Sequence, residues 1–239
     1  MSITILLLIC QAELFQPQDM IKFADHLFAQ EDYAAALHEY RRYIFLGDSV
    51  GDGVYERIIE CLVQLGRYDE AIRESTHIND TNKRNYTQGI VFFAAGEMDS
   101  SRTYLDQVAV PYHDEARELI GFGYAYEFNF EAAADYIELP EHEPSYKKPA
   151  LGALFSILPG GGHFYAGRFG DGLYSLLLIS TAGLLSYYYY DRNEDIKFGF
   201  ALGAAILLYA GNVYGGINSV RNYNYYQNEK YRQEIMGIK

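Results

Sequence analysis

The sequence predicts an all-α protein in which a solenoid of helical hairpins is followed by a transmembrane helical hairpin. Three observations support this prediction. One spacing of small and aromatic residues recurs four times between residues 19 and 140. Two charge-free stretches of 19 and 23 residues follow, at 172–190 and 198–220. Most acidic residues precede residue 149, so the two parts of the chain differ in physical character.

The composition excludes several classes of protein. Of 239 residues, 49% are apolar and 21% are charged, which excludes a disordered chain. Two cysteines exclude a disulfide-stapled fold, a Cys-rich zinc module and an iron–sulfur protein. The net charge of −13 argues against a nucleic-acid partner. Residues 1–148 hold 26 Asp or Glu and 12 Lys or Arg, whereas residues 149–239 hold 6 and 7, so an acidic module precedes a nearly neutral one.

Residues 1–12 are predicted to be a signal peptide. Ile3 to Cys10 form an apolar run of the length of a signal-peptide core, far short of the roughly 20 residues of a spanning helix. Cys10 and Ala12 are the small residues that cleavage after Ala12 requires. No Lys or Arg precedes the run, so the alternative is a first buried helix or strand of the next domain. Cleavage would leave Cys61 as the one cysteine, which we expect to be a buried apolar residue.

A repeated pattern predicts helical hairpins over residues 13–140. Each unit has a small residue, an apolar residue three positions later, an aromatic residue or Met six positions after that, and a small residue three further on. Helices joined by a short turn approach closely, so each helix needs a small residue at the point where the two touch. The aromatic residue fills the gap to the next pair. Successive units are offset by 35, 30 and 32 residues, and they are Ala24/Leu27/Tyr33/Ala36, Ile59/Leu62/Tyr68/Ala71, Gly89/Phe92/Met98/Ser101 and Gly121/Tyr124/Phe130/Ala133.

This pattern resembles the tetratricopeptide repeat, whose period is 34 residues. The second unit, Gly66-Arg67-Tyr68-Asp69-Glu70-Ala71, matches it best, although the chain has no Trp to take the place of the repeat's helix-packing Trp. The resemblance implies no chemistry. It implies a concave groove, formed by the first helix of each pair, that binds a peptide segment of a protein partner. The acidity of this part of the chain would favour a partner with basic segments, or it serves only to keep the domain soluble.

Residues 141–148 are predicted to be a linker, because they contain Pro144, precede Pro149 and show no apolar periodicity. The triplet Glu141-His142-Glu143 supplies metal-ligand residue types. Three such residues on one flexible segment, without a second cluster, are expected to form a solvated loop. We therefore predict no metal site and no cofactor.

Residues 149–221 are predicted to form a membrane domain, with a polar tail at 222–239. The stretches 172–190 and 198–220 are each long enough to cross a bilayer of about 30 Å at 1.5 Å per residue. The loop 191–197 between them carries five charges and must lie in water. A buried hairpin in a soluble protein is the alternative, but the remaining chain is too small to cover two helices that are apolar on all faces.

The second stretch carries glycines on one stripe, which predicts close helix packing. Small residues four apart let apolar helices approach each other in a membrane, and the first stretch offers Ala182 and Ser186 at the same spacing. The stripe could meet the first helix or another subunit, so a homo-oligomer is possible. The four glycines are Gly199, Gly203, Gly211 and Gly215.

A Pro-Gly motif precedes the first span. Residues 150–158 are too few to cross a membrane, so we expect an interfacial or re-entrant helix, a glycine turn and then the span. The string resembles Pro-Gly-x-Gly-x-x-Tyr-x-Gly, which opens small bacterial two-span membrane domains. A related family ends its second span with an Asp. This chain has no Asp at that place, and its nearest polar residues are Asn212 and Asn218. The matching residues are Pro159, Gly160, Gly162, Tyr165, Gly167 and Gly172.

His163 lies within the Pro-Gly motif and is predicted to have a structural role. A proton relay would need a charged partner, for which Asp171 is the candidate. A ring that caps the glycine turn or lies among lipid headgroups is the simpler expectation.

Two signals conflict on sidedness. Cleavage after Ala12 exports the repeats, whereas Lys and Arg flank the hairpin on the repeat side, which favours cytoplasmic repeats. Once a folded domain has been translocated, the spans that follow have little freedom to choose their orientation, so we give the signal peptide more weight. We therefore predict a bacterial inner-membrane protein with periplasmic repeats.

These features predict a non-catalytic, membrane-anchored scaffold that recruits a protein partner in the bacterial cell envelope. One alternative is an oligomeric transport or channel component built on the Gly-rich hairpin, which would require polar residues along one face of each span. Another is an intramembrane enzyme, which would require more spans to shield a Ser–His pair. No catalytic residue is predicted.

Overall fold

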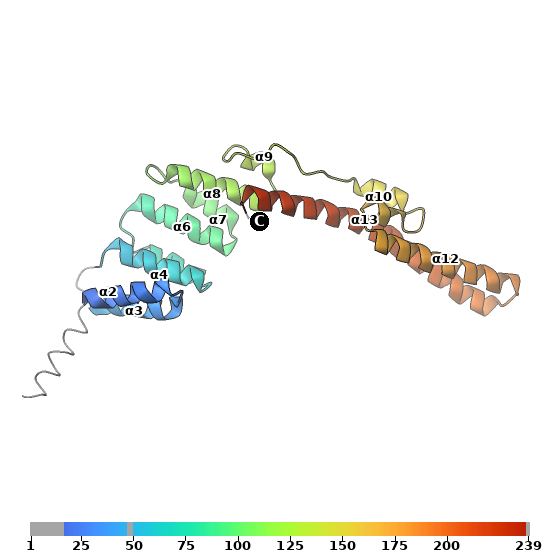
Figure 1. The fold of residues 1–239 in the computed structure, drawn as a ribbon, viewed down its shortest axis with the longest axis horizontal. Coiled ribbons are helices and arrows are strands. Elements are labelled where there is room, and N and C mark those ends of the chain that lie inside the picture. The colour runs from blue at the N-terminus through green and yellow to red at the C-terminus, as the bar shows by residue number, and fades with distance from the viewer. Residues whose placement is uncertain (1–16, 47–49, 238–239) are drawn as a thin grey trace, which may run out of the picture. The chain divides into compact units, whose positions relative to one another are not determined.

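The computed structural model describes residues 17–46 and 50–237, and these residues form helices with no strand (Figure 1). The chain divides into two compact units, residues 1–139 and 140–239. The predicted all-α fold class, with helical hairpins and a C-terminal hairpin, is confirmed. The predicted signal peptide, residues 1–12, lies outside the described residues.

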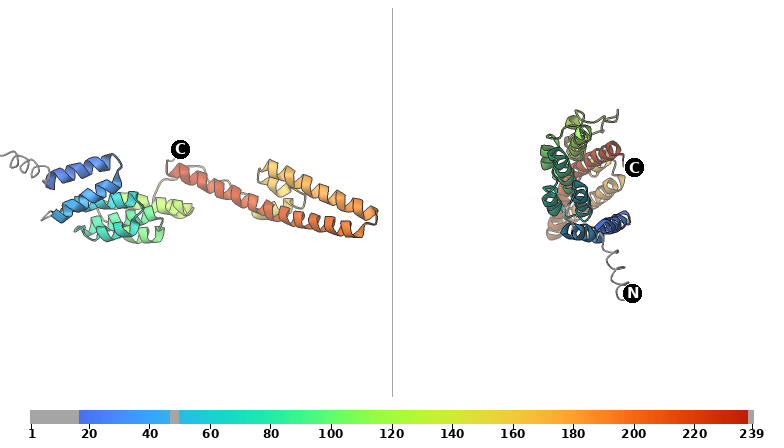
Figure 2. Two further views of the ribbon diagram at one scale, coloured as in Figure 1. Left: turned by 90° about the horizontal axis from the view of Figure 1, so that it is seen from below. Right: turned by 90° about the vertical axis from the view of Figure 1, so that its left-hand side faces the viewer.

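The first unit is a series of four helical hairpins, and each pair packs on the next, as the views in Figures 1 and 2 show. In every pair the second helix begins at the aromatic residue or Met of the repeated pattern. The pairs are α2 (Pro17–Ala29) with α3 (Tyr33–Leu46), α4 (Asp52–Gln64) with α5 (Tyr68–Ser75), α6 (Thr81–Ala95) with α7 (Met98–Leu105), and α8 (His113–Tyr126) with α9 (Phe130–Ala133).

The four hairpin turns share one backbone feature. The residue two positions before each second helix has a positive φ of 61° to 80°, a conformation that glycine adopts without strain and other residues rarely adopt. Two turns use glycine at this position and two do not. In chain order these residues are Glu31, Gly66, Gly96 and Phe128.

Small residues lie where the helices of a pair cross. Ala24, Ala36, Ala71 and Ala133 are fully buried. A Cβ on Gly89 would lie 2.4 Å from Leu105 Cδ2, and one on Gly121 would lie 2.6 Å from Ile137 Cγ2, so neither position has space for a side chain. At the same level the Ser101 hydroxyl donates a hydrogen bond of 2.8 Å to the Gly89 carbonyl oxygen.

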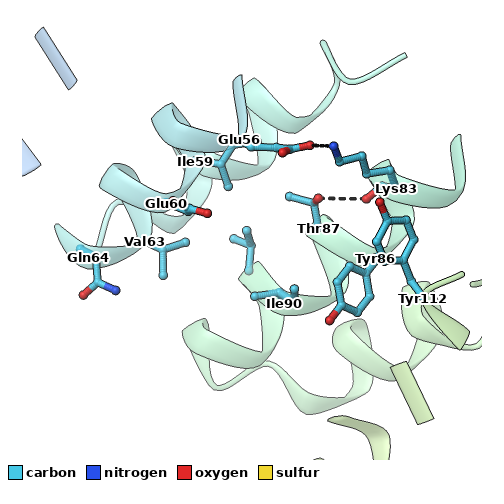
Figure 3. A pocket seen from close by; sticks show the side chains of 11 residues that line it. Glu56, Ile59, Glu60, Val63, Gln64, Lys83, Tyr86, Thr87, Ile90 and Tyr112 are labelled. Atoms are coloured by element: carbon cyan, nitrogen blue, oxygen red, sulfur yellow. Dashed lines mark hydrogen bonds and ion pairs between the residues drawn. The ribbon is translucent and has the colours of Figure 1, made fainter. Parts of the chain in front are cut away.

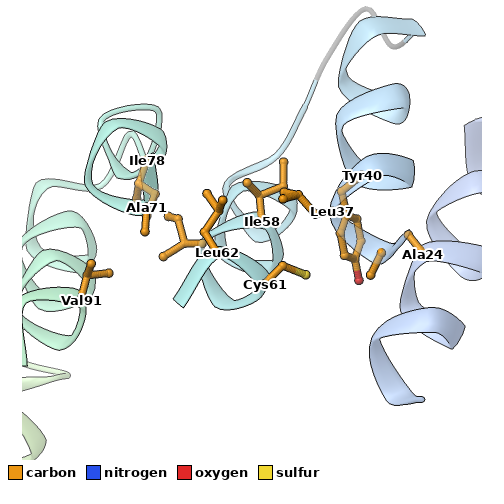
Figure 4. Close-up of a cluster of buried hydrophobic side chains, with 11 residues drawn as sticks. Ala24, Leu37, Tyr40, Ile58, Cys61, Leu62, Ala71, Ile78 and Val91 are labelled. Carbon is orange, nitrogen blue, oxygen red and sulfur yellow. The ribbon is translucent and has the colours of Figure 1, made fainter. Parts of the chain in front are cut away.

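Figure 4 shows the apolar core of the first three pairs, in which Cys61 lies. Cys61 is fully buried, and its burial raises the pKa of its thiol to about 11. The nucleophilic thiolate is therefore scarce at neutral pH.

We predict that iodoacetamide at pH 7.5 leaves Cys61 unmodified in the folded chain and modifies it fully in denaturant, as measured by peptide mass spectrometry. Rapid modification without denaturant would contradict this placement.

Neighbouring hairpins are joined by side-chain hydrogen bonds, each of which links two residues 27 positions apart. The Asp52 carboxylate accepts from the Asn79 backbone N–H and side-chain amide. One pair later, the Asn82 side chain accepts from the Ala109 N–H at 2.6 Å and donates to the Ala109 carbonyl oxygen at 2.9 Å. These bonds fix the loop that precedes each new hairpin.

We predict that Asn82→Ala lowers the free energy of unfolding of the first unit by about 1–2 kcal/mol, because the hydrogen bonds of its side chain to the backbone of Ala109 and Val110 are lost. Thermal unfolding followed by circular dichroism measures this loss. Asn85→Ala on the same helix is the control, since the Asn85 side chain has only a long contact of 3.5 Å to Gln107. Equal melting temperatures for the two variants would contradict the prediction.

The second unit holds α10 (Pro149–Phe155), α11 (Gly161–Tyr165), α12 (Phe169–Asp191) and α13 (Asp195–Ile235). α12 packs along α13, and α10 and α11 pack on α13 as well. Two helices, α12 and α13, are long and apolar enough to cross a membrane. Within the most apolar window of each, only 11% of the residues are buried, which distinguishes them from the core helices of a soluble protein.

α13 does not end where the second span was predicted to end. The helix continues through most of the predicted polar tail to Ile235, because residues 217–236 contain neither Gly nor Pro. Gly237 follows with a φ of 64°.

The predicted linker, residues 141–148, is held against α13. The Lys147 backbone N–H donates to Asn224 Oδ1, and the Asn224 amide donates back to the Lys147 carbonyl oxygen, both at 2.8 Å. The Tyr146 hydroxyl donates to Asn228 Oδ1. This segment therefore belongs to the second unit, and the reason is that α13 extends far enough to supply amide side chains beside it.

Candidate functional site

A cavity of about 480 Å³ opens between the first helices of the second and third hairpins (Figure 3). α4 and α6 form its two walls, and Tyr112, directly before α8, closes one end. The lining residues are Glu56, Ile59, Glu60, Val63, Gln64, Lys83, Tyr86, Thr87, Ile90, Val91 and Tyr112.

The two walls are built in the same way. On α4 the lining residues fall at positions i, i+3, i+4, i+7 and i+8 from Glu56, and on α6 they fall at the same spacings from Lys83. With 3.6 residues per turn, such positions share one helix face. The equivalent faces of two successive hairpins therefore point into one cavity.

The cavity has an apolar floor and a charged rim. Ile59 and Val91 are buried in the floor, whereas Ile90 remains 37% exposed. The rings of Tyr86 and Tyr112 stack with their centroids 5.0 Å apart. Aromatic and aliphatic side chains of this kind are typical of ligand-binding pockets, in which a few polar groups fix orientation.

Charges around the rim influence one another. Lys83 forms an ion pair with Glu56, and this contact raises the pKa of the lysine. The carboxylate of Glu60 accepts a hydrogen bond of 2.8 Å from Arg57. Burial, followed by the negative charges of Glu115 and Glu118, raises the pKa of the Tyr86 hydroxyl. Two carboxylates of the rim, Glu56 and Glu60, are therefore each paired with a cation, and two further carboxylates on α8 act on Tyr86.

Of the predicted repeat-packing residues, Ile59 alone lines this cavity. The others are distributed over the four hairpins: Ala24, Ala36, Ala71, Met98, Ser101 and Ala133 are buried, and Tyr33 and Tyr68 pack against the core. The prediction concentrated on the hairpin turns, so it did not include the lining residues. Their equal spacing on α4 and α6 is the sequence signal that would have identified them.

A second dense cluster surrounds the Pro-Gly motif. Gly160 has a φ of 81°, and a Cβ on it would lie 2.1 Å from the Gly172 carbonyl oxygen. A Cβ on Gly162 would lie 2.7 Å from Gly216 Cα, and one on Gly172 would lie within 3 Å of the Phe164 ring. Close backbone approach thus requires glycine at positions 160 and 162, and the packed Phe164 ring requires it at position 172.

The other motif residues surround this turn. Gly167 has a φ of 85° and open space beside it. Tyr165 accepts a hydrogen bond of 2.8 Å at its carbonyl oxygen from Lys147 Nζ, and its hydroxyl accepts one of 3.3 Å from the Lys148 N–H. Pro159 is half-buried.

The side-chain amide of Asn212 on α13 forms hydrogen bonds with backbone groups of the turn. Its Oδ1 accepts from the Gly160 N–H and its amide donates to the Ser156 carbonyl oxygen, both at 2.8 Å. Asn212 is 4% exposed, so these bonds are shielded from water. One amide from the second long helix therefore holds both sides of the glycine turn.

His163 does not pair with Asp171. Its Nδ1 lies 2.8 Å from Ser219 Oγ on α13, whereas Asp171 forms an ion pair with Arg168. The reason is that α11 turns the imidazole toward α13. A Cβ added at Gly215 on that helix would lie 3.0 Å from the ring. His163 and Ser219 are both buried and link α11 to α13.

The predicted glycine stripe is divided in the structure. A Cβ on Gly199, Gly203 or Gly211 would meet open space, whereas one on Gly215 would lie 3.0 Å from the His163 ring. The first three glycines therefore do not make the contact between α12 and α13. Close approach in this unit involves Gly152, Gly162 and Gly216 instead.

Across residues 17–46 and 50–237, no group of three His, Cys, Asp or Glu side chains is placed to hold a metal ion. Comparisons of the chain with protein families, with curated proteins and with solved structures gave no match. The geometry of the two clusters is therefore the basis for inferring function.

Proposed function

We propose that the protein is a non-catalytic, membrane-anchored scaffold of tetratricopeptide type, which recruits a protein partner in the bacterial cell envelope. The observation that carries this proposal is the cavity between α4 and α6. It is formed by the first helices of successive hairpins, the surface on which repeat proteins of this architecture bind peptide segments.

The anchoring part of the proposal rests on the second unit. Apolar side chains on α12 and α13 face outward, for example Leu184 at 70% and Phe200 at 78% exposure. Contiguous apolar surface of this kind needs lipid or another protein to cover it. The charged loop at 191–197 limits the apolar surface at one end. We propose the inner membrane as the location, with the first unit in the periplasm.

Site-specific photocrosslinking in native membranes tests the recruitment. Benzoyl-phenylalanine placed at Ile90, which lines the cavity, is expected to give a discrete adduct with another protein. The same residue placed at Thr103, an exposed position on α7 outside the cavity, is the matched control. No adduct from position 90, or equal adducts from both positions, would contradict the proposal.

A further inference from the structure

We propose that the cavity between α4 and α6 receives a large apolar side chain of a partner segment whose flanking residues are Lys or Arg. This inference rests on the proposed function and specifies the chemistry of the partner. Its two parts, the apolar anchor and the basic flanks, depend on different observations.

The apolar anchor follows from the floor of the cavity. Ile59, Val63, Ile90 and Val91 present aliphatic surface to a space of about 480 Å³, within the range of roughly 300–1,000 Å³ of ligand pockets. Ile90 is 37% exposed, although its neighbour Val91 is buried. A bulky apolar side chain from a partner would cover this surface and release the water beside it.

The basic flanks follow from the charges at the rim. Lys83 is the one basic residue among the lining residues, and it is already paired with Glu56. Glu60 lines the cavity with a half-exposed side chain, and Arg57 pairs with only one of its two carboxylate oxygens. Glu115 and Glu118 lie on α8, which packs on α6, and their charges help to raise the pKa of Tyr86. A cationic side chain would meet these carboxylates and the stacked tyrosine rings, which also attract cations.

The same charges argue against two other occupants. Residues 1–139 carry 24 Asp or Glu and 10 Lys or Arg, a balance of −14. The acidic unit of a second copy would be repelled by this surface, and so would a membrane of anionic lipids. A basic segment is the partner that the negative electrostatic potential of this unit attracts, and its binding should weaken as salt increases.

Fluorescence anisotropy on the full chain in neutral-detergent micelles tests the inference. The probe is a fluorescein-labelled eight-residue peptide with Leu-Phe at its centre, two Lys on each side and a Gly at each end. Two comparison peptides replace Lys with Glu, or Leu-Phe with Ser-Ser. We expect the first peptide to bind, and each comparison peptide to bind at least about tenfold more weakly. Micelles without protein correct for adsorption.

Variants locate the binding in the cavity. We expect Ile90→Ser to weaken the first peptide about tenfold and Glu60→Gln to weaken it about threefold. Glu131→Gln removes the same charge from an exposed position on α9 and should leave affinity unchanged. Circular dichroism confirms folding, and the peptide comparison on the unaltered chain does not depend on any variant.

Each outcome decides a separate point. Equal binding of the Glu peptide would overturn the basic flanks, and equal binding of the Ser-Ser peptide would overturn the apolar anchor. If no peptide binds while position 90 still crosslinks to another protein, this inference fails and the proposed function stands. If position 90 crosslinks only to a second copy of the chain, both fail.

Discussion

Gly162→Ala is expected to detach α10 and α11 from α13. A Cβ at position 162 would lie 2.6 Å from the Gly152 carbonyl oxygen and 2.7 Å from Gly216 Cα. These are backbone atoms of two helices, so no side-chain rotation relieves the contact. Overpacking of this kind costs typically about 1–3 kcal/mol, and occasionally more where backbone must move.

Trypsin cleavage after Lys147 in detergent micelles measures this detachment. The Lys147 backbone is bonded to Asn224 on α13, and its side chain reaches Tyr165 at the end of α11. Loss of the packing should speed cleavage about tenfold, as expected if a closed state loses about 1.4 kcal/mol. Gly170→Ala is the control, because a Cβ there meets open space. Equal cleavage rates in the two variants would show that the turn is not packed as described.

Ala71→Trp is expected to destabilise the first unit strongly. Ala71 lies on α5 with no exposed surface, inside the cluster that joins the first three hairpins. An indole at this position must push helices apart, at a cost of about 1–3 kcal/mol or more. The melting temperature followed by circular dichroism should fall by roughly 5–15 °C. Ala94→Trp, at an exposed position on α6, should change it little, and equal shifts would contradict the hairpin register.

The hairpins of the first unit could be predicted because their spacing has a local cause. A short turn forces two helices together, so small residues must recur at fixed distances from it, as Ala71 and Gly89 do. The left-handed residue before each second helix was only partly predictable. Gly66 and Gly96 are typical of such a conformation, whereas Glu31 and Phe128 adopt one that is sterically unfavourable for a residue with a Cβ.

The contacts in the second unit depend on residues far apart in the chain, which spacing cannot pair. Asn212 bonds to Gly160 across 52 positions, and His163 to Ser219 across 56. Glycines at helical spacing indicate that a close approach is possible, but they do not identify the partner. The stripe that includes Gly203 is predicted to pack on the first long helix or on another subunit, whereas within this chain the close approach is made at Gly216.

The proposed function requires that one chain joins a membrane-embedded hairpin to a water-exposed helical unit. Carbonate extraction of membranes, followed by protease digestion of the pellet and mass spectrometry, tests it most directly. The chain should stay in the pellet, peptides from the first unit should be released, and peptides from 172–190 and 198–220 should remain with the lipid. Recovery of the whole chain in the supernatant, or efficient cleavage within those two stretches, would contradict a membrane-embedded hairpin.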